Sequence, residues 1–359
     1  MTHQWQGVLR EYADRLDVTD ATPIVTLGEG GTPLIPAPAL SRRTGAQVHI
    51  KFEGMNPTGS FKDRGMTMAI SKAVEHGAKA VICASTGNTS ASAAAYAAYA
   101  GIQSVVLVPE GKIAMGKLSQ AIVHGAQLLQ VRGNFDDCLQ IARELSANYP
   151  VHLVNSVNND RIEGQKTASF EIVDVLGDAP DFHFIPVGNA GNYTAYTRGF
   201  VEDAEAGRTT RLPRMFGFQA VGAAPIVLGH PVKDPDTIAT AIRIGNPASW
   251  ELALAARDTT NGYFGAISDS TILEAQKILA AEVGIFVEPA SAISVAGLLE
   301  RAAAGVIPAG AVVTVTVTGH GLKDPQWGLR LADGSEAKPT VVAVDVAAVA
   351  DAIGLKANA

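Results

Sequence analysis

The chain alternates between short apolar runs rich in β-branched residues and longer segments of helical character. Four runs in the first half predict strands, at residues 79–83, 104–108, 127–131 and 151–154. The segments between them predict helices, at residues 88–100, 115–124 and 136–148. A second series of predicted strands follows, at residues 182–187, 215–220 and 311–318, with helices between them. Alternation at this spacing predicts an α/β fold whose largely parallel sheets are covered by helices on both faces.

A chain of 359 residues is long for one hydrophobic core, so two lobes or one large α/β domain are expected. The two series of strands favour two lobes. The smaller lobe is predicted at residues 51–155, and the larger lobe at residues 1–50 together with 156–359. After Asp333 the chain predicts a terminal strand and a helix.

Composition excludes several classes of protein. Apolar residues make up 47% and charged residues 18%, which is ordinary globular composition, and the net charge of −7 argues against a nucleic-acid-binding protein. The two cysteines, Cys83 and Cys138, have no Cys or His at metal-ligand spacing, so neither a metal site nor a disulfide framework is expected. Residues 1–20 lack the apolar core of a signal peptide, and no run reaches the roughly 20 apolar residues of a membrane span. A cytoplasmic protein without a membrane partner is expected.

Residues 56–65 read Asn-Pro-Thr-Gly-Ser-Phe-Lys-Asp-Arg-Gly and carry the most informative lysine of the chain, Lys62. A long cation gains little from a tight turn between glycines. Its amine becomes useful when it forms a Schiff base with a carbonyl cofactor, which is chemistry that Lys can perform and Arg cannot. The alternative is a surface turn with a solvated lysine.

A second stretch supplies what such a cofactor needs. Residues 188–192 read Gly-Asn-Ala-Gly-Asn, after an apolar run and before a predicted helix. Gly188, Asn189, Ala190, Gly191 and Asn192 therefore form a glycine-rich turn at a helix N-terminus, where free N–H groups hold a phosphate. Together with Lys62, this turn suggests pyridoxal 5'-phosphate.

Hydroxyl groups crowd the loop at residues 85–90, which joins a predicted strand to a helix. Ser85, Thr86, Asn88 and Thr89 belong to this loop, and its position at a helix N-terminus favours an anion such as a substrate carboxylate. The alternative is that Ser85 or Asn88 merely caps the helix. Ligands of open α/β sheets gather beyond the carboxyl ends of strands, and this loop lies at such an end.

A second anion pocket is predicted from several dispersed cations and amides. The candidates are Lys112, Lys117, Asn155, Ser156, Asn158, Arg161 and Lys166. A lone lysine in such a loop is usually solvated, which is the alternative for each cation. The functional interpretation gains weight when the substrate carries a phosphate, because a dianion needs more than one fixed cation or amide.

Two further segments are ambiguous from the residues alone. Thr318 ends the last strong strand and offers a hydroxyl to a pyridine nitrogen, although without the other motifs an ordinary strand-to-loop turn is the preferred explanation. Glu288 precedes a predicted helix and is either a site residue or an acid at a helix start.

Taken together, these strings resemble threonine synthases of the shorter, bacterial and archaeal kind, within the β-family (fold type II) of pyridoxal-phosphate enzymes. The resemblance runs from about residue 27 to residue 325. Its motifs are residues 29–34, 56–64, 85–90, 188–192 and 318–325. The Gly-Asn-Ala-Gly-Asn string is the most discriminating, because cysteine synthases and serine/threonine dehydratases carry a different glycine-rich phosphate loop.

The resemblance implies a role for each matching residue. Lys62 would form the Schiff base and act as base and acid, and Asn88 would hydrogen-bond the cofactor's phenolic oxygen. Residues 188–192 would hold the cofactor phosphate, and Thr318 would face the pyridine nitrogen. Ser85, Thr86, Asn88 and Thr89 are implied on the carboxylate side of the substrate. The substrate phosphate is assigned to three candidates, Lys112, Asn155 and Arg161.

The implied fold has two lobes with the cofactor in the cleft between them, and the family leads us to expect a homodimer. The implied reaction converts O-phospho-L-homoserine and water to L-threonine and phosphate. Two alternatives stay open: a threonine/serine dehydratase of the same fold, and a non-catalytic amino-acid sensor. Retention of Lys62 argues against the sensor, since a mere binder does not need the Schiff base.

Overall fold

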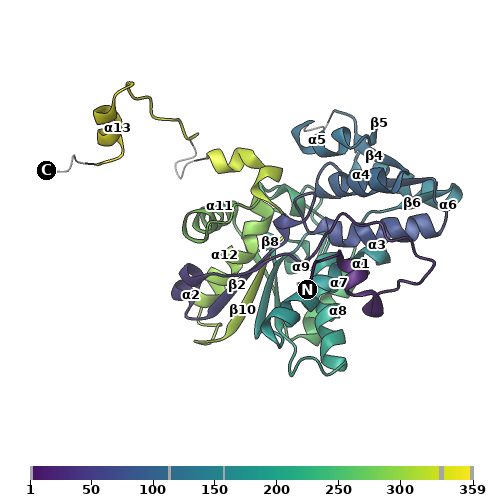
Figure 1. Ribbon diagram of the computed structural model, residues 1–359, viewed down its shortest axis with the longest axis horizontal. Helices are drawn as coiled ribbons and strands as arrows, with labels where there is room; N and C mark the ends of the chain where they lie inside the picture. Colours follow the sequence, from purple (N-terminus) through teal and green to yellow (C-terminus); the bar gives the residue numbers. More distant parts are fainter. Residues whose placement is uncertain (1–2, 112–114, 157, 331–334, 356–359) are drawn as a thin grey trace. The chain divides into compact units, whose positions relative to one another are not determined.

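The computed structural model describes residues 3–111, 115–156, 158–330 and 335–355 (Figure 1). Residues 1–324 form one compact unit, and residues 325–359 form a second, small unit. The first unit holds two sheets, and every site residue predicted from the sequence belongs to it.

The larger sheet has six strands in the order β1-β2-β10-β7-β8-β9. These are β1 (Leu34–Pro36), β2 (Gln47–Phe52), β10 (Val312–Val317), β7 (Phe182–Pro186), β8 (Arg214–Ala220) and β9 (Tyr263–Ile267). Only β1 is antiparallel to its neighbour among these pairs. The smaller sheet is parallel throughout, in the order β5-β4-β3-β6. Its strands are β5 (Gln127–Val131), β4 (Gln103–Pro109), β3 (Ala80–Ala84) and β6 (Val151–Leu153).

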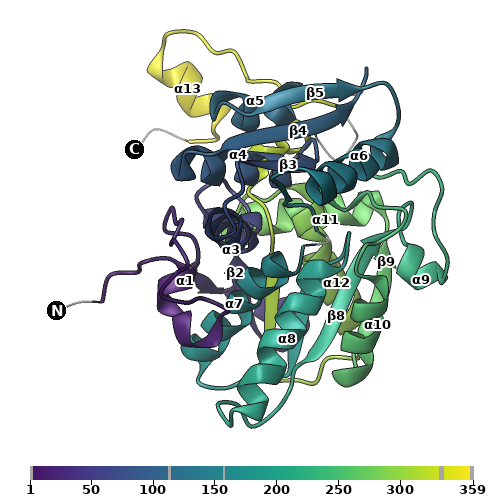
Figure 2. The ribbon, with the colours of Figure 1, turned by 90° about the vertical axis from the view of Figure 1, so that its right-hand side faces the viewer.

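Helices connect the strands and cover the sheets (Figure 2). In the first half of the chain they are α1 (Val8–Glu11), α2 (Pro38–Thr44), α3 (Lys62–Glu75), α4 (Asn88–Ala100), α5 (Met115–Val123) and α6 (Phe135–Asn148). The second half contributes α7 (Asn159–Leu176), α8 (Gly191–Glu205), α9 (Pro225–Leu228), α10 (Trp250–Thr259), α11 (Asp269–Ile278) and α12 (Pro289–Ala303). The small C-terminal unit contains α13 (Val346–Ala352).

The predicted α/β fold with mostly parallel sheets is confirmed. Each of the seven predicted strands is present with ends within one residue of the prediction, and α4 begins and ends as predicted. Sequence reasoning missed β1, β2 and β9. The predicted terminal strand is wrong for the described part of the C-terminal segment, where residues 335–355 contain α13 but no strand.

The lobe boundaries at residues 50/51 and 155/156 stay a prediction. Two features bear on them. The boundary between residues 50 and 51 falls inside β2, which belongs to the larger sheet. Residues 325–359, assigned to the larger lobe, form a unit of their own.

Side chains of alternate residues on each strand face opposite layers of helices, because successive residues of a strand point to opposite faces. In the smaller sheet, Val81 and Cys83 pack with α3 and α4, whereas Ile82 and Ala84 pack with Cys138 and its helix α6. Burial on both faces explains why β3 is apolar throughout.

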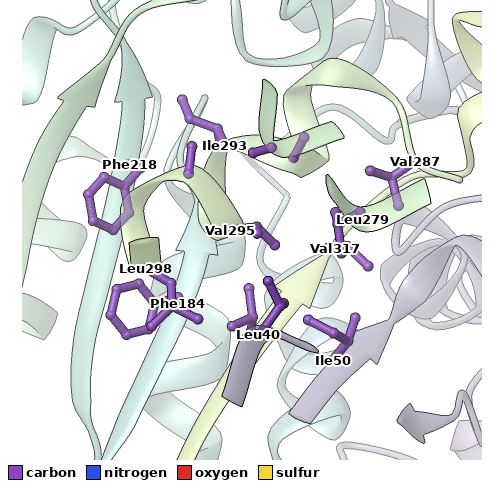
Figure 3. Packing of buried hydrophobic residues seen from close by; sticks show 14 of the residues in the cluster. Leu40, Ile50, Phe184, Phe218, Leu279, Val287, Ile293, Val295, Leu298 and Val317 are labelled. Carbon is purple, nitrogen blue, oxygen red and sulfur yellow. The ribbon is translucent and has the colours of Figure 1, made fainter. Parts of the chain in front are cut away.

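The larger sheet follows the same rule. Phe184 and Phe218 face α12, where Ile293, Val295 and Leu298 complete the core (Figure 3). The opposite face packs against α7, α8 and α10 through Ile185, Val187, Met215 and Phe264, among other residues. A sheet covered in this way is rigid, so the loops at the ends of its strands are held in fixed positions.

Helix α7 is joined to α3 and to α8 through glycines at close contacts. A Cβ atom on Gly164 would lie 2.0 Å from the backbone oxygen of Arg64, at the start of α3. A Cβ atom on Gly199 of α8 would lie 2.0 Å from Oγ of Ser169. Since α3 begins at Lys62 and α7 carries Arg161, the first contact fixes these two residues relative to each other.

Four charged side chains are buried between α3, α7 and the strand β2. Arg64 donates to Glu53 (Nε to Oε2, 2.6 Å) and to Glu171 (Nη2 to Oε2, 2.7 Å), and Lys51 donates to Glu171 (Nζ to Oε2, 2.6 Å). Burial opposes the ionisation of Glu171, but Arg64 and Lys51 outweigh it and lower the pKa of that carboxyl from 4.5 to about 2. The cluster contains two cations and two carboxylates, so its charges balance. We call these four residues the buried ion cluster.

Candidate active site

A pocket in the first unit brings together residues from distant parts of the sequence. Seven of the residues predicted to bind the cofactor line it, together with one predicted to bind the substrate phosphate: Lys62, Asn88, Gly188, Asn189, Ala190, Gly191, Asn192 and Arg161. The remaining predicted cofactor residue, Thr318, lines the same pocket. The sequence motifs therefore converge on one site.

The segment before Lys62 is held by the loop that follows β10. The N–H of Phe61 donates to the carbonyl oxygen of Thr318 (2.9 Å), and the N–H of His320 donates to that of Gly59 (2.9 Å). These bonds form a short antiparallel bridge between Ser60 and Gly319. Gly59 has φ 84°, a conformation that favours glycine and allows the sharp turn before α3. Lys62 and Thr318 are consequently fixed on two paired segments.

The pocket favours the uncharged form of the Lys62 amine. Burial lowers the pKa of Lys62 well below its ordinary value, and the positive charge of Arg161 lowers it further. The negative charge of Glu288 opposes this shift in part. An uncharged amine has a free electron pair, with which Lys62 can act as a nucleophile or as a base.

The loop at residues 188–192 leads from β7 into α8, as predicted. Helix α8 begins at Gly191, and Ala190 before it has φ 65°, which is unusual for a residue other than glycine. The loop is anchored by Asn189, whose backbone oxygen accepts the N–H of Ser249 at 3.1 Å. Both polar atoms of the Asn192 amide are buried without a hydrogen-bond partner. Buried amides of this kind are normally paired, so this one marks a place for a polar ligand.

Asn88, the first residue of α4, donates from Nδ2 to Oε1 of Glu288 at 2.9 Å. Glu288 lines the pocket and is only 4% exposed. Sequence analysis left two roles open for this glutamate, and the structure places it in the site.

Thr318 pairs with a residue that the sequence did not single out as a ligand. Its Oγ1 lies 2.9 Å from Oγ of Ser291, either of which can be the donor. Oγ of Ser291 also accepts the N–H groups of Thr318 (3.0 Å) and Gly319 (2.7 Å). Ser291 thus fixes both the backbone and the hydroxyl of Thr318.

Arg161 is a buried cation with spare donors. Its Nη1 donates to the backbone oxygen of Val154 (3.1 Å), whereas Nε and Nη2 have no partner in the structure. Burial lowers the pKa of Arg161 to about 10, with a small opposing effect from Cys83. No carboxylate among the described residues forms an ion pair with it. A buried guanidinium without a carboxylate is costly, and an anionic ligand would relieve that cost.

Ser156, a candidate for the second anion pocket, also lines the pocket, whereas other predicted substrate residues lie outside its lining. The amide of Asn155 is already engaged, since it accepts from the N–H of Ala84 and donates to its carbonyl oxygen, both at 2.9 Å. Ser85, Thr86 and Thr89 are near the start of α4 but do not line the pocket. Lys112 falls outside the described residues.

Sequence reasoning missed several residues that line the pocket. They are Phe61, Ile162, Gln165, Pro186, Ala241 and Ile242. Gln165 follows Arg161 by one helical turn, so the helical period could have identified it. The segment Thr240–Ile242 carries no comparable signal, because only the tertiary fold brings Ile242 against Gly188.

Comparison with known proteins agrees with these motifs. A family model described as "Pyridoxal-phosphate dependent enzyme" matches residues 25–319. The threonine synthase of Mycobacterium tuberculosis is 60% identical over 356 residues, which cover 99% of this chain and 98% of that protein. The threonine synthase of Synechocystis sp. is 60% identical over 91% of this chain and 86% of its own length.

Solved structures support the fold. The processed form of threonine deaminase isoform 2 from Solanum lycopersicum has a TM-score of 0.70 at 24% identity, covering 80% of this chain and 79% of that one. At this level of identity the likeness concerns the fold alone. The similarities in sequence go further, and the chain belongs to the threonine synthase family, within the fold type II pyridoxal-phosphate-dependent enzymes.

Proposed function

We propose that this protein converts O-phospho-L-homoserine and water to L-threonine and inorganic phosphate, with pyridoxal phosphate as its cofactor. The observation that carries the proposal is the near full-length identity of 60% to threonine synthases. The pocket supports it, because Lys62, Arg161 and the loop at residues 188–192 line the same site.

The residues present fit the cofactor. The amine of Lys62 has a lowered pKa, the Asn192 amide is buried without a partner, and α8 directs its N-terminus to the pocket. We assign the cofactor phosphate to residues 188–192, the phenolic oxygen to Asn88 and the ring nitrogen to Thr318. When bound, pyridoxal phosphate supplies an electron sink for the reacting amino acid.

Lys62 is the proposed carrier of the cofactor and the proposed base. Its uncharged amine would take the proton from the substrate Cα, and in the charged form it would return a proton later in the reaction. Thr318 would present a neutral hydroxyl instead of a carboxylate to the ring nitrogen. A neutral partner leaves that nitrogen less protonated, so we expect little transamination.

Arg161 is the strongest of the candidates for the phosphate group of the substrate. Its two unpartnered donors suit a dianion, and guanidinium binds phosphate through paired hydrogen bonds. The assignments of Lys112 and Asn155 to this phosphate, and of Ser85, Thr86 and Thr89 to the substrate carboxylate, stay predictions. The engaged amide of Asn155 favours instead a role in joining the ends of β3 and β6.

Incubation with O-phospho-L-homoserine tests the function directly. Equal amounts of L-threonine and phosphate should appear together, and Arg161→Met should raise KM by about 10-fold or more through loss of charged hydrogen bonds. The exposed Arg10→Met is the matched control and should leave KM unchanged. Release of ammonia and 2-oxobutyrate from threonine, without threonine formation from the phosphorylated substrate, would show a dehydratase instead.

No helix among the described residues is long and apolar enough to cross a membrane. The cytoplasmic location and the homodimer stay predictions, and sedimentation analysis of the purified protein would test the latter.

A further inference from the structure

Glu288 stands out as the carboxylate of the pocket. Among the described residues that line the pocket, the charged ones are Lys62, Arg161 and Glu288. Glu288 is the residue before α12, which packs on the larger sheet. Its hydrogen-bond partner Asn88 is the first residue of α4, which packs on the smaller sheet. The bond therefore links the start of a helix on the larger sheet to the start of a helix on the smaller sheet.

A carboxylate fixes the orientation of an amide. An ionised carboxylate only accepts hydrogen bonds, so Asn88 must turn its NH₂ group, and not its oxygen, toward Glu288. One of the two hydrogens on Nδ2 is used in this bond, and the orientation of the whole amide is then set. An amide without such a partner can present either its oxygen or its NH₂ group to a ligand.

The carboxylate is itself held in place. Oε1 of Glu288 lies 2.3 Å from the position that a Cβ on Gly319 would occupy, so the carboxylate lies directly over the backbone of Gly319. The N–H of Glu288 also donates to the carbonyl oxygen of Gly319 (3.1 Å). Gly319 belongs to the bridge that holds the Lys62 segment. Gly319 thus contacts both the carboxylate and the lysine segment, and the carboxylate in turn holds the Asn88 amide.

We infer that Glu288 is a positioning residue, which fixes the Asn88 amide so that its remaining N–H donor is available to the phenolic oxygen of the cofactor. This inference deepens the proposed function and rests on the assignment of Asn88 to that oxygen. Glu288 acts on this donor through its hydrogen bond to Asn88, so its removal should weaken cofactor binding much less once Asn88 is gone.

A double-mutant cycle on the affinity for pyridoxal phosphate tests this inference. The variants are Asn88→Ala, Glu288→Met and the two combined, and the dissociation constant is measured by fluorescence titration of the apoenzyme. Each single variant should weaken binding on the order of 10-fold, and the double variant should bind much more tightly than the product of the two single effects predicts. The absorption maximum of the bound cofactor should shift in the same way in all three.

Two further variants separate a positioning role from a general loss of structure. Glu288→Gln keeps an acceptor oxygen for Asn88 and should stay within about 3-fold of the wild type. Gly319→Ala leaves the Glu288 side chain chemically intact but displaces it, and should reproduce the weaker binding and the spectral shift of Glu288→Met. Glu300→Gln, on an exposed residue of the same helix, is the matched control and should change neither value.

The outcomes distinguish the inference from the assignment beneath it. An Asn88→Ala variant that binds pyridoxal phosphate normally would overturn the assignment of Asn88 and the inference with it. An affected Asn88→Ala with an unaffected Glu288→Met would overturn the inference alone. Effects that multiply in the double variant would also overturn it, because Glu288 would then act independently of Asn88.

Discussion

Removal of Arg64 should expose how strongly the buried ion cluster depends on charge balance. Lys51, Glu53, Arg64 and Glu171 carry two positive and two negative charges, and all four are buried. Arg64→Met leaves one negative charge in excess, and Glu53 loses its only ion pair among the described residues. Breaking a buried ion pair by removing one partner costs about 3–5 kcal/mol. We expect the free energy of unfolding at pH 8 to fall by an amount in that range.

The loss should depend on pH with a definite sign. In the wild type, the pKa of Glu171 is lowered from 4.5 to about 2, so its contribution to stability is present above pH 4.5 and is lost as the pH falls toward 2. In Arg64→Met the excess negative charge can be neutralised by proton uptake. The difference between variant and wild type should therefore be smaller at pH 5 than at pH 8.

Urea titration followed by circular dichroism measures both effects, with protein and pyridoxal phosphate concentrations held constant. The control is the double variant Arg64→Met/Glu53→Gln, which restores charge balance and keeps an acceptor for Thr32. It should recover at least half of the lost stability at pH 8. If the two substitutions are instead additive, or if the loss is the same at both pH values, the explanation by charge balance is refuted.

Three more predictions follow from the site and the packing. Lys62→Arg should lower kcat by about 10³-fold or more, since a guanidinium stays protonated, and a phosphate-release assay checks this. Gly164→Ala should destabilise the protein by about 1–3 kcal/mol, because the new methyl group meets the Arg64 backbone, and a lower melting temperature would show it. Burial lowers the pKa of His183 from 6.5 to about 3, so the unfolded state binds more protons between these values. The free energy of unfolding should fall by about 1.4 kcal/mol per pH unit below 6.5, and His183→Gln should remove that part of the slope in urea titrations at several pH values.

The strands that could be predicted from the sequence are those that depend on local pattern alone. β7 and β10 are buried on both faces, and both are mainly apolar, with one histidine in β7 and two β-branched threonines in β10. β2 was missed because it contains His49 and Lys51. The burial of Lys51 depends on Glu171, which lies 120 residues further along the chain, and no local pattern reveals such a partner.

In the site, too, local patterns could be predicted from the sequence and partners distant in sequence could not. Lys62 and residues 188–192 were identified because turn and helix-start chemistry is local, and both line the pocket. Asn155 was proposed as a ligand from its residue type, yet its amide pairs with Ala84 at the end of a strand that is a neighbour only in space. Glu288 could not be assigned because its partner Asn88 is 200 residues away.

The place of β10 in the larger sheet has a consequence for synthesis on the ribosome. β10 lies between β2 and β7, although it is translated after every other strand of the unit. A nascent chain that has released β2 and β7 lacks the strand that joins them, and the Ser60 segment lacks its pairing partner Gly319. The vitamin-derived cofactor can thus find its complete binding site only after Gly319 has been translated, so a chain that stalls before residue 312 should be an unfinished sheet with open edges.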